Sequence, residues 1–445
     1  MTVSVFGIWW VLLLLTYYVN KRYEYLIFLV MLSFVFQASY VFVIGKADIN
    51  AGIVTCFFVL INTLYSTHGK LKTVAWQRIM LLFVFWTLII SIVAPSLFEG
   101  MQIMGITNNE YDFHKFHWET VQLSASNISQ CLTIILYALT VVSLYTKDKV
   151  VSNQEYQKIY LRVYSVVAIL GLCNMALMYF HLPTELYQTV FHNEADIIGD
   201  TYVNRYYIGN FSKFISTFYE ASYCGAYLAV SSILFLHYFD TSIFIKAFSL
   251  VLLAFNLSST GFVTFLVLES LVIIQNFRRH IISKKWLTVY TTLLIVAAIL
   301  ILFNSSIIDN LYAYTVGKIS SGSFDIRTKV DSIALQTLPK THGLGLGMNS
   351  IQTYSLIPSL LAQVGVIGLL LYTFFVARCI KWASHITSEA IITQLMGIII
   401  AQILSIQALN FCLFWQAIFA IVVVRADEST RTTVSGKADM KGLHN

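Results

Sequence analysis

Long runs of hydrophobic residues, separated by short polar breaks, repeat along nearly the whole chain. Each run approaches the roughly 20 apolar residues that a helix needs to cross a bilayer. A helix satisfies its own backbone hydrogen bonds in lipid, so repeated runs of this length predict spanning helices. We therefore expect an all-α, polytopic integral membrane protein that forms a single membrane domain over residues 1–445.

The pattern predicts about 12 or 13 transmembrane helices. The count depends on the run Ile391–Val424, which is too long for one span and which we divide at the polar residues near Asn410. The expected spans are residues 3–19, 24–44, 50–66, 76–97, 121–145, 160–180, 217–238, 242–258, 260–276, 286–304, 357–377, 390–406 and 410–424.

Only 11% of the residues are charged, against about a quarter in soluble proteins, which excludes a water-soluble globule. Numbering the connections alternately places 20 of the 28 Lys and Arg residues on one side of the membrane. That side is expected to be cytoplasmic and to carry the tail 425–445. The net charge of +6 thus orients the chain and does not indicate a nucleic-acid partner. The remaining basic residues are Lys46, Lys115, Arg205, Lys213, Lys318, Arg327, Lys329 and Lys340.

The connections expected outside include three large loops, at residues 98–120, 181–216 and 305–356. Any chemistry outside the bilayer is expected there, because sites are built disproportionately on loops. The chain has no Walker A loop, no HExxH and no dinucleotide fingerprint, so we expect no cofactor and no metal. The cluster His192, Glu194 and Asp196 has cation ligands, but acidic loops of this kind are usually solvated.

The third loop predicts a short amphipathic helix on the outer surface. Ile326, Val330, Ile333 and Ala334 share one helical face, with Ser323 placed to cap the helix and Pro339 to end it. Arg327 and Asp331 are four residues apart on its polar side. They predict either a solvated ion pair or an arginine that the carboxylate orients.

Glycine then alternates at Gly343, Gly345 and Gly347. Glycine at every second position lets backbone N–H groups approach a phosphate, and it equally permits tight packing of a re-entrant segment. Both interpretations remain open from the sequence.

These residues resemble the O-antigen polymerase (Wzy) and O-antigen ligase family. The resemblance rests on Arg327, on His342-Gly-Leu-Gly-Leu-Gly347, and on a span that opens Leu360-Leu-Ala-Gln-Val-Gly-Val-Ile-Gly368. Two further segments are similar to the family's pattern, Phe211–Leu228, in which Ala221 replaces the usual proline, and Asn256-Leu-Ser-Ser-Thr-Gly-Phe262. The ligases' loop histidine follows the glycine-rich stretch, and this chain has none between Met348 and Ser384, which favours a polymerase.

The resemblance implies a metal-independent glycosyltransferase. It would transfer an oligosaccharide from undecaprenyl pyrophosphate to the sugar hydroxyl of another lipid-linked repeat unit, on the outer face of the bacterial cytoplasmic membrane. It also implies membrane lipid, a chain-length regulator and a flippase as partners. Arginine can hold a pyrophosphate without a metal, so we assign this role to Arg205 and Arg327, one in each of two large outer loops.

For the base that deprotonates the acceptor hydroxyl, we assign Glu220, where the second loop meets its span, and His342. Lys213, Lys329 and the three alternating glycines are the further substrate-binding residues that we predict.

Glu269 lies in the middle of an expected span, where a charge is costly and a carboxyl is functional by default. In a polymerase we expect a protonated packing group bonded to Ser or Asn of another helix. The alternative is a transporter or flippase with Glu269 as its coupling site.

The charge pattern makes a topological prediction. Cysteine introduced at Ser321, in the third outer loop, should react with an impermeant thiol reagent in intact spheroplasts, because that loop is expected outside. Cysteine at Ser283, in a basic connection, should react only after the membrane is opened. Labelling in the opposite order would contradict the topology and any mechanism placed on the outer face.

Overall fold

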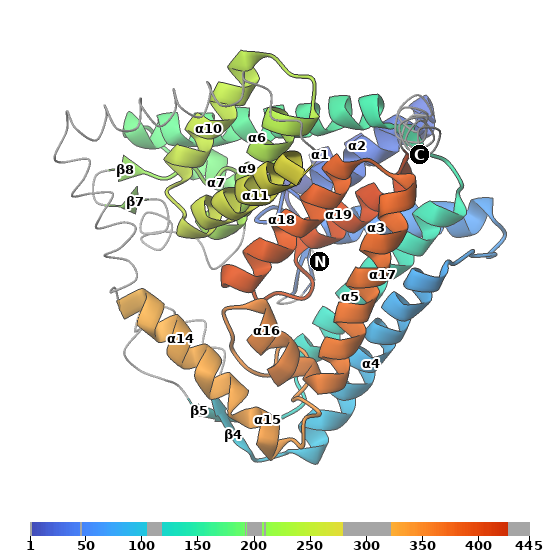
Figure 1. Cartoon of the computed structure of the whole chain (residues 1–445), viewed down its shortest axis with the longest axis vertical. Coiled ribbons are helices and arrows are strands. Elements are labelled where there is room, and N and C mark those ends of the chain that lie inside the picture. Colours follow the sequence, from blue (N-terminus) through green and yellow to red (C-terminus); the bar gives the residue numbers. More distant parts are fainter. Residues whose placement is uncertain are drawn as a thin grey trace, which may run out of the picture.

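The chain is mainly helical, as the hydrophobic runs predict (Figure 1). The structure is a computed structural model that describes residues 2–44, 47–104, 118–191, 193, 207–208, 211–278 and 322–425. Within these described residues, five helical segments are long and apolar enough to cross a membrane, which is compatible with a polytopic membrane protein. They are α4 (Ala75–Leu97), α5 (Ala125–Thr146), α6 (Asn153–Tyr179), α11 (Ser259–Arg278) and the segment Leu356–Ile386.

Shorter helices occupy most of the other expected spans. They are α1 (Val5–Asn20), α2 (Tyr23–Ser33), α3 (Ala51–Ser66), α9 (Ala221–Ile233), α10 (Ile243–Asn256), α18 (Glu389–Ser405) and α19 (Cys412–Val423). A π-helical turn, η2 (Leu234–Tyr238), extends α9, and α7 (Glu185–Phe191) lies in the second expected outer loop. The expected span 286–304 falls outside the described residues.

The prediction of one helix over residues 24–44 is wrong in its second half. After α2 the chain turns and forms strand β2 (Tyr40–Ile44). This segment is rich in aromatic and β-branched residues, which favour strands. It pairs with β1 (Thr2–Val3) and β3 (Ala47–Asn50), so its backbone groups find partners without a helix.

Short strands therefore supplement the expected all-α architecture. β4 (Gln102–Met104) pairs with β5 (Trp118–Thr120), and β7 (Tyr207–Ile208) pairs with β8 (Phe211–Ser212). β6 (Val151–Ser152) pairs in parallel with β9 (Val424–Arg425). The last pair joins two connections that the charge pattern assigns to the cytoplasmic side, whereas the other strands lie in connections assigned to the outer side. Each pair thus joins segments expected on the same side.

Small residues allow the central helices to pack closely. A Cβ added at Gly261 of α11 would lie 2.9 Å from the Cα of Gly225 in α9. A Cβ at Gly397 of α18 would lie 2.6 Å from side-chain atoms of both Val230 and Leu268. Helix α19 is buried over nearly its whole length. α4, α5 and α17 (Gly365–Ile386) run beside this core (Figure 1).

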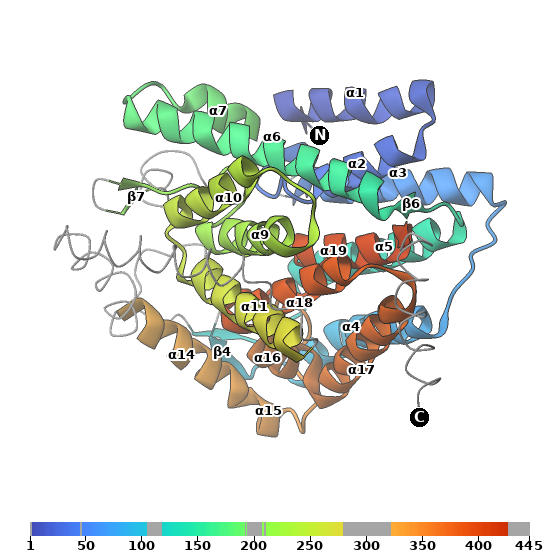
Figure 2. The same ribbon diagram turned by 45° about the horizontal axis from the view of Figure 1, so that its top comes forward.

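The third expected outer loop contains the predicted helix, with different ends. α14 spans Gly322–Leu335, so Ser323 lies in its first turn and does not precede it as a cap. α15 (Thr337–Lys340) contains Pro339, so the proline does not end the helical segment there. Figures 1 and 2 show α14, α15 and β4 together at one edge of the molecule, which we call the α14 end.

Candidate functional site

The apolar face of α14 is docked on the rest of the protein. Val330 and Ala334, two residues of the predicted face, are buried. Ala334 belongs to a small hydrophobic cluster separate from the main core, with Ile103, Val121, Leu346, Ile351 and Ala362. The side chain of Ile326 lies outside the described part, and Ile333 is half-buried. α14 therefore packs on the β4–β5 hairpin and on the glycine-rich segment.

Asp331 fastens α14 to the start of the next span. Its carboxylate accepts a hydrogen bond of 2.7 Å from the backbone N–H of Tyr354 and one of 2.6 Å from Ser355 Oγ. Burial raises the pKa of the Asp331 carboxyl, and these hydrogen bonds and the charge of Arg327 oppose the rise. Asp331 is therefore hydrogen-bonded to the protein and is not the solvated surface residue that one interpretation of the sequence expected.

Arg327 lies one turn before Asp331 and is half-buried. Its Cζ atom is 5.3 Å from the centroid of the Tyr354 ring, within the range of a cation–π interaction. Tyr354 thus contacts both Arg327 and Asp331, the two residues that the sequence placed on the polar side of the helix. The guanidinium is held beside the loop that precedes α16 (Leu356–Ser359).

The glycine-rich segment uses its backbone N–H groups internally. The N–H groups of Leu346 and Gly347 donate to the carbonyls of Ala362 and Gln363, at 2.9 and 2.8 Å. The N–H of Gly343 donates to the Leu338 carbonyl, and those of Leu344 and Gly345 donate to the carbonyl and the hydroxyl of Thr341. The N–H of Met348 donates to Ser91 Oγ, and that of Asn349 donates to Gln363 Oε1. In this structure the donors are committed to protein acceptors, which favours the packing interpretation over a phosphate cradle.

The glycines allow the segment 343–347 to pack against the interruption in the helical span Leu356–Ile386. The span that begins with α16 passes through a π-helical turn, η3 (Leu360–Val364), and resumes as α17 at Gly365. Gly365 has a φ of 74°, and a Cβ there would lie 2.3 Å from the carbonyl oxygens of Gly343 and Leu344. Trp86 Nε1 donates to the Val364 carbonyl at 2.9 Å. The glycine-rich segment and α4 thus satisfy backbone groups beside the break.

The remaining predicted site residues are spread over several elements. Glu220 is half-buried just before α9, and Ser222 Oγ donates to its carboxylate at 3.0 Å. Lys213 is half-buried, whereas Lys329 and His342 are exposed at the α14 end. Figures 1 and 2 both show α14, which carries Arg327, well separated from α9, the helix that Glu220 precedes. Arg205 lies outside the described residues, as does the cluster His192, Glu194 and Asp196.

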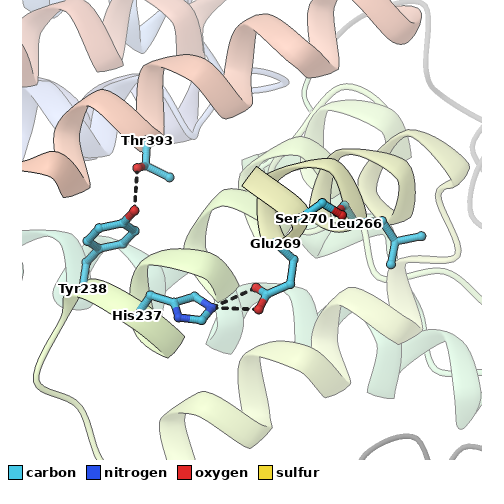
Figure 3. A network of polar contacts seen from close by, with 6 residues as sticks. All are labelled: His237, Tyr238, Leu266, Glu269, Ser270 and Thr393. Carbon is cyan, nitrogen blue, oxygen red and sulfur yellow. Dashed lines mark hydrogen bonds and ion pairs between the residues drawn. The ribbon is translucent and has the colours of Figure 1, made fainter. Parts of the chain in front are cut away.

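A second polar site lies within the helical core. His237 in η2 faces Glu269 in α11, with Nε2 at 2.9 Å from both carboxylate oxygens (Figure 3). The two side chains are 7% and 8% exposed. The expected partner of Glu269 was a serine or asparagine of another helix, and the structure places His237 in that position. Ser270, beside Glu269 in the same helix, donates to the Leu266 carbonyl. The structure therefore corrects the identity of the partner.

The sequence did not single out His237. Its hydropathy context marks it only as a polar residue near the end of a span, 32 positions before Glu269. The signal in the sequence was Glu269 itself. Inserting a charged side chain at the middle of a span costs about 2.5–3.5 kcal/mol, so this carboxyl is expected to have a partner on another helix. His237 is an ionisable candidate for that role in the adjoining helix α9 and its π turn.

Together these observations define a mainly helical protein with several hydrophobic spans, a docked polar helix at one end and a buried, hydrogen-bonded pair of His237 and Glu269 in its core. Comparison with protein-family models, with curated proteins and with solved structures found no match. In the described part of the chain no group of three or more His, Cys, Asp or Glu residues is placed to hold a metal.

The contacts of Asp331 predict how α14 responds to substitution. Asp331→Ala leaves two half-buried donors without their acceptor, at a cost of about 1 kcal/mol, and should lower the hydrogen-exchange protection of α14 by roughly fivefold. Asp331→Asn should retain it, because an amide can accept from the Tyr354 N–H and donate to the Ser355 hydroxyl.

The sign of the pH effect follows from the raised pKa of Asp331. A carboxyl with a raised pKa binds its proton more tightly when docked, so docking weakens as pH rises through the raised pKa. Protection of α14, corrected for intrinsic exchange, should therefore be greater at mildly acidic pH in wild type and not in Asp331→Asn. Asp240→Asn, exposed and distant in sequence, is the control. Equal protection in the alanine variant and wild type would show that Asp331 does not fasten the helix.

Proposed function

We propose that the protein is a metal-independent polysaccharide polymerase. It joins undecaprenyl-pyrophosphate-linked oligosaccharide repeat units of the O-antigen or capsule type at the α14 end, on the outer face of the bacterial cytoplasmic membrane. The observation that carries the proposal is the half-buried Arg327, stacked on Tyr354 in the segment that resembles the polymerases. The docking of α14 supports it, because a docked helix holds that guanidinium in one place.

The reaction requires that the negative charge developing on the pyrophosphate leaving group be stabilised. The acceptor hydroxyl oxygen attacks the anomeric carbon of the donor, and the bond from that carbon to the pyrophosphate oxygen breaks with its electron pair. A guanidinium is permanently charged and offers paired N–H donors, so Arg327 can stabilise this negative charge beside lipid. Arg205, in the second outer loop, is the other arginine that we assign to the pyrophosphate.

The acceptor hydroxyl must lose its proton during the attack. Glu220 is the base that we favour, because it is half-buried and a neighbouring hydroxyl, Ser222, orients its carboxylate. His342 is the second candidate, exposed at the α14 end. Attack and departure take place at the same anomeric carbon, so the base must reach the acceptor hydroxyl close to the pyrophosphate that Arg327 holds. A base at Glu220 therefore requires the reacting groups to lie between α14 and the start of α9, whereas His342 is already at the α14 end. Lys213 and Lys329 would bind the substrate at its periphery.

The glycine-rich segment has a supporting role in this proposal. Its N–H groups are already bonded, so Gly343, Gly345 and Gly347 act through the packing of the broken span and not as direct phosphate donors. They hold the start of that span, where Tyr354 and Ser355 receive α14.

The arginines provide the test of this assignment. Arg327→Lys keeps the charge but loses the planar fork and its stacking on Tyr354, and loss of such a contact typically costs about 10²-fold in rate. We predict that Arg327→Lys and Arg205→Lys each abolish most long-chain polymer in protein that inserts and expresses normally, measured as the ladder of sugar chain lengths. Arg278→Lys, at the end of α11, is the matched control and should have no effect. Wild-type polymer from Arg327→Ala would refute this role of α14.

A transporter or flippase for a lipid-linked oligosaccharide is the second candidate, favoured by the buried pair of His237 and Glu269. Two measurements separate the candidates. Cells that lack a polymerase should carry single capped repeats, whereas loss of a transporter leaves unflipped lipid-linked units inside. Glu269→Gln keeps the shape and hydrogen bonding of the side chain, so a polymerase should retain its product ladder. Complete loss of activity in well-expressed Glu269→Gln would favour coupling at Glu269 and the transporter.

A further inference from the structure

Two connections between helices meet on the side of the molecule away from α14. One joins α3 to α4 through residues 67–74, and the other joins α5 to α6 through residues 147–152. The backbone N–H of Lys72 donates to Thr146 Oγ1 at 2.9 Å, and the same hydroxyl lies 3.3 Å from the Lys72 carbonyl. Figures 1 and 2 show the connection from α3 to α4 on the side opposite α14.

The two connections bring basic residues together. They contain four lysines and one acidic residue, Asp148. The lysines, which we call the lysine cluster, are Lys70, Lys72, Lys147 and Lys149. The charge pattern assigns both connections to the cytoplasmic side, and the contact of Lys72 with Thr146 shows that lysines distant in the sequence share one place on that side.

Lys147 is the most constrained member of the lysine cluster. It follows the last residue of α5 directly and is half-buried. Its Nζ atom donates to Asn62 Oδ1 of α3 at 2.5 Å. Within the described part of the chain, no carboxylate forms an ion pair with this ammonium. An ammonium has three N–H donors, so two of them can bind an anion while Asn62 holds the third.

The surroundings of Lys147 lack a compensating negative charge. Burial lowers the pKa of the Lys147 ammonium to about 8, and the charge of Lys149 contributes to the decrease. The carbonyl ends of α3 and α5 attract cations, which explains why lysines occur there. A helix dipole also attracts an exposed ammonium, however, so it does not explain why this one is half-buried without a carboxylate. An anion bound beside Lys147 would supply the missing charge.

Exposed apolar side chains lie next to the lysine cluster in the sequence. Ile61, Leu64 and Tyr65 flank Asn62 on α3, and Leu71 and Val150 lie in the two connections. Tyr65 is 86% exposed, as expected of an aromatic residue where a membrane meets water. Cations beside apolar surface fit a ligand that joins an anionic group to hydrocarbon chains.

We propose that Lys147, together with Lys72 and Lys149, binds the phosphate of an anionic phospholipid at this end of the protein. The ammonium groups donate to the phosphate oxygens, and the acyl chains lie along the exposed apolar residues of α3. The bound headgroup links the ends of α3 and α5, which Lys147 and Asn62 already join. The site is remote from α14, and the proposal does not rest on the polymerase activity.

The first test measures the titration of Lys147 in the full-length protein. Nanodiscs contain either phosphatidylcholine alone or phosphatidylcholine with phosphatidylglycerol, and neither lipid has a primary amine. An amine-reactive reagent modifies neutral lysines, and mass spectrometry follows each lysine over a pH series. In phosphatidylcholine the midpoint for Lys147 should lie at about 8. Phosphatidylglycerol should raise this midpoint, because a bound anion stabilises the charged form.

The exposed Lys158 of α6 reports the general effect of an anionic membrane on a nearby lysine. The midpoint for Lys147 should rise by more than that for Lys158. Equal shifts would overturn the proposal, because they would show only attraction to a charged surface. The same rise with millimolar inorganic phosphate in phosphatidylcholine nanodiscs would also overturn it, because the ligand would then be a soluble anion.

The second test counts phosphatidylglycerol molecules that stay bound to the protein in native mass spectrometry. Lys147→Gln should weaken this binding by roughly fivefold, the usual effect of one basic residue near an anionic lipid surface. Lys147→Arg should retain the lipid, because a guanidinium also binds phosphate. Lys158→Gln is the matched control. Equal retention in Lys147→Gln and wild type would overturn the proposal, and so would equal losses in Lys147→Gln and Lys158→Gln.

Discussion

The need to satisfy backbone polar groups in apolar surroundings shapes the α14 end. The span that begins at Leu356 breaks at Gly365, and a break exposes carbonyl and N–H groups that lipid cannot bond. The glycine-rich segment meets this need, and it can approach the break closely because a Cβ at Gly345 would lie 2.6 Å from the Gly365 nitrogen. Its position then places α15 and the hydrophobic cluster on which α14 docks. The location of Arg327 on α14 thus depends on the packing of the glycine-rich segment against the interrupted helix.

The same constraint takes an electrostatic form in the helical core. Glycines at the crossing of α9 and α11, and in α18, bring three helices close together. Close packing excludes water, so an ionisable side chain there depends on a partner from a neighbouring helix. His237 supplies this partner for Glu269, and the π turn that carries it replaces the regular end of α9. Small residues and the buried pair are therefore parts of one arrangement.

Hydropathy predicted the helices because lipid allows few alternatives to a helix in an apolar run. It failed at residues 40–44, where pairing with β1 and β3 gives the backbone another way to bond. The face of α14 with Val330 and Ala334 was also predictable, since burial follows helical periodicity. The partners of Asp331 and Glu269 were not, because Tyr354, Ser355 and His237 lie 23 to 32 positions away on other elements. Local patterns report which residue needs a partner, and tertiary packing decides which residue provides it.

The two polar sites hold charges of different chemical kinds. Arg327 keeps its charge at every physiological pH, so it suits a ligand that is always anionic, such as a phosphate. His237 and Glu269 instead bond to each other across two helices of the core. A permanent cation at the docked end can bind and orient a substrate, but it cannot take up or release a proton. The pair in the core lies between closely packed helices, and its burial keeps it from contacting a bulky polar ligand. The docked end therefore keeps its cation half-exposed, where a ligand can reach it, whereas the polar atoms of the core pair bond to each other.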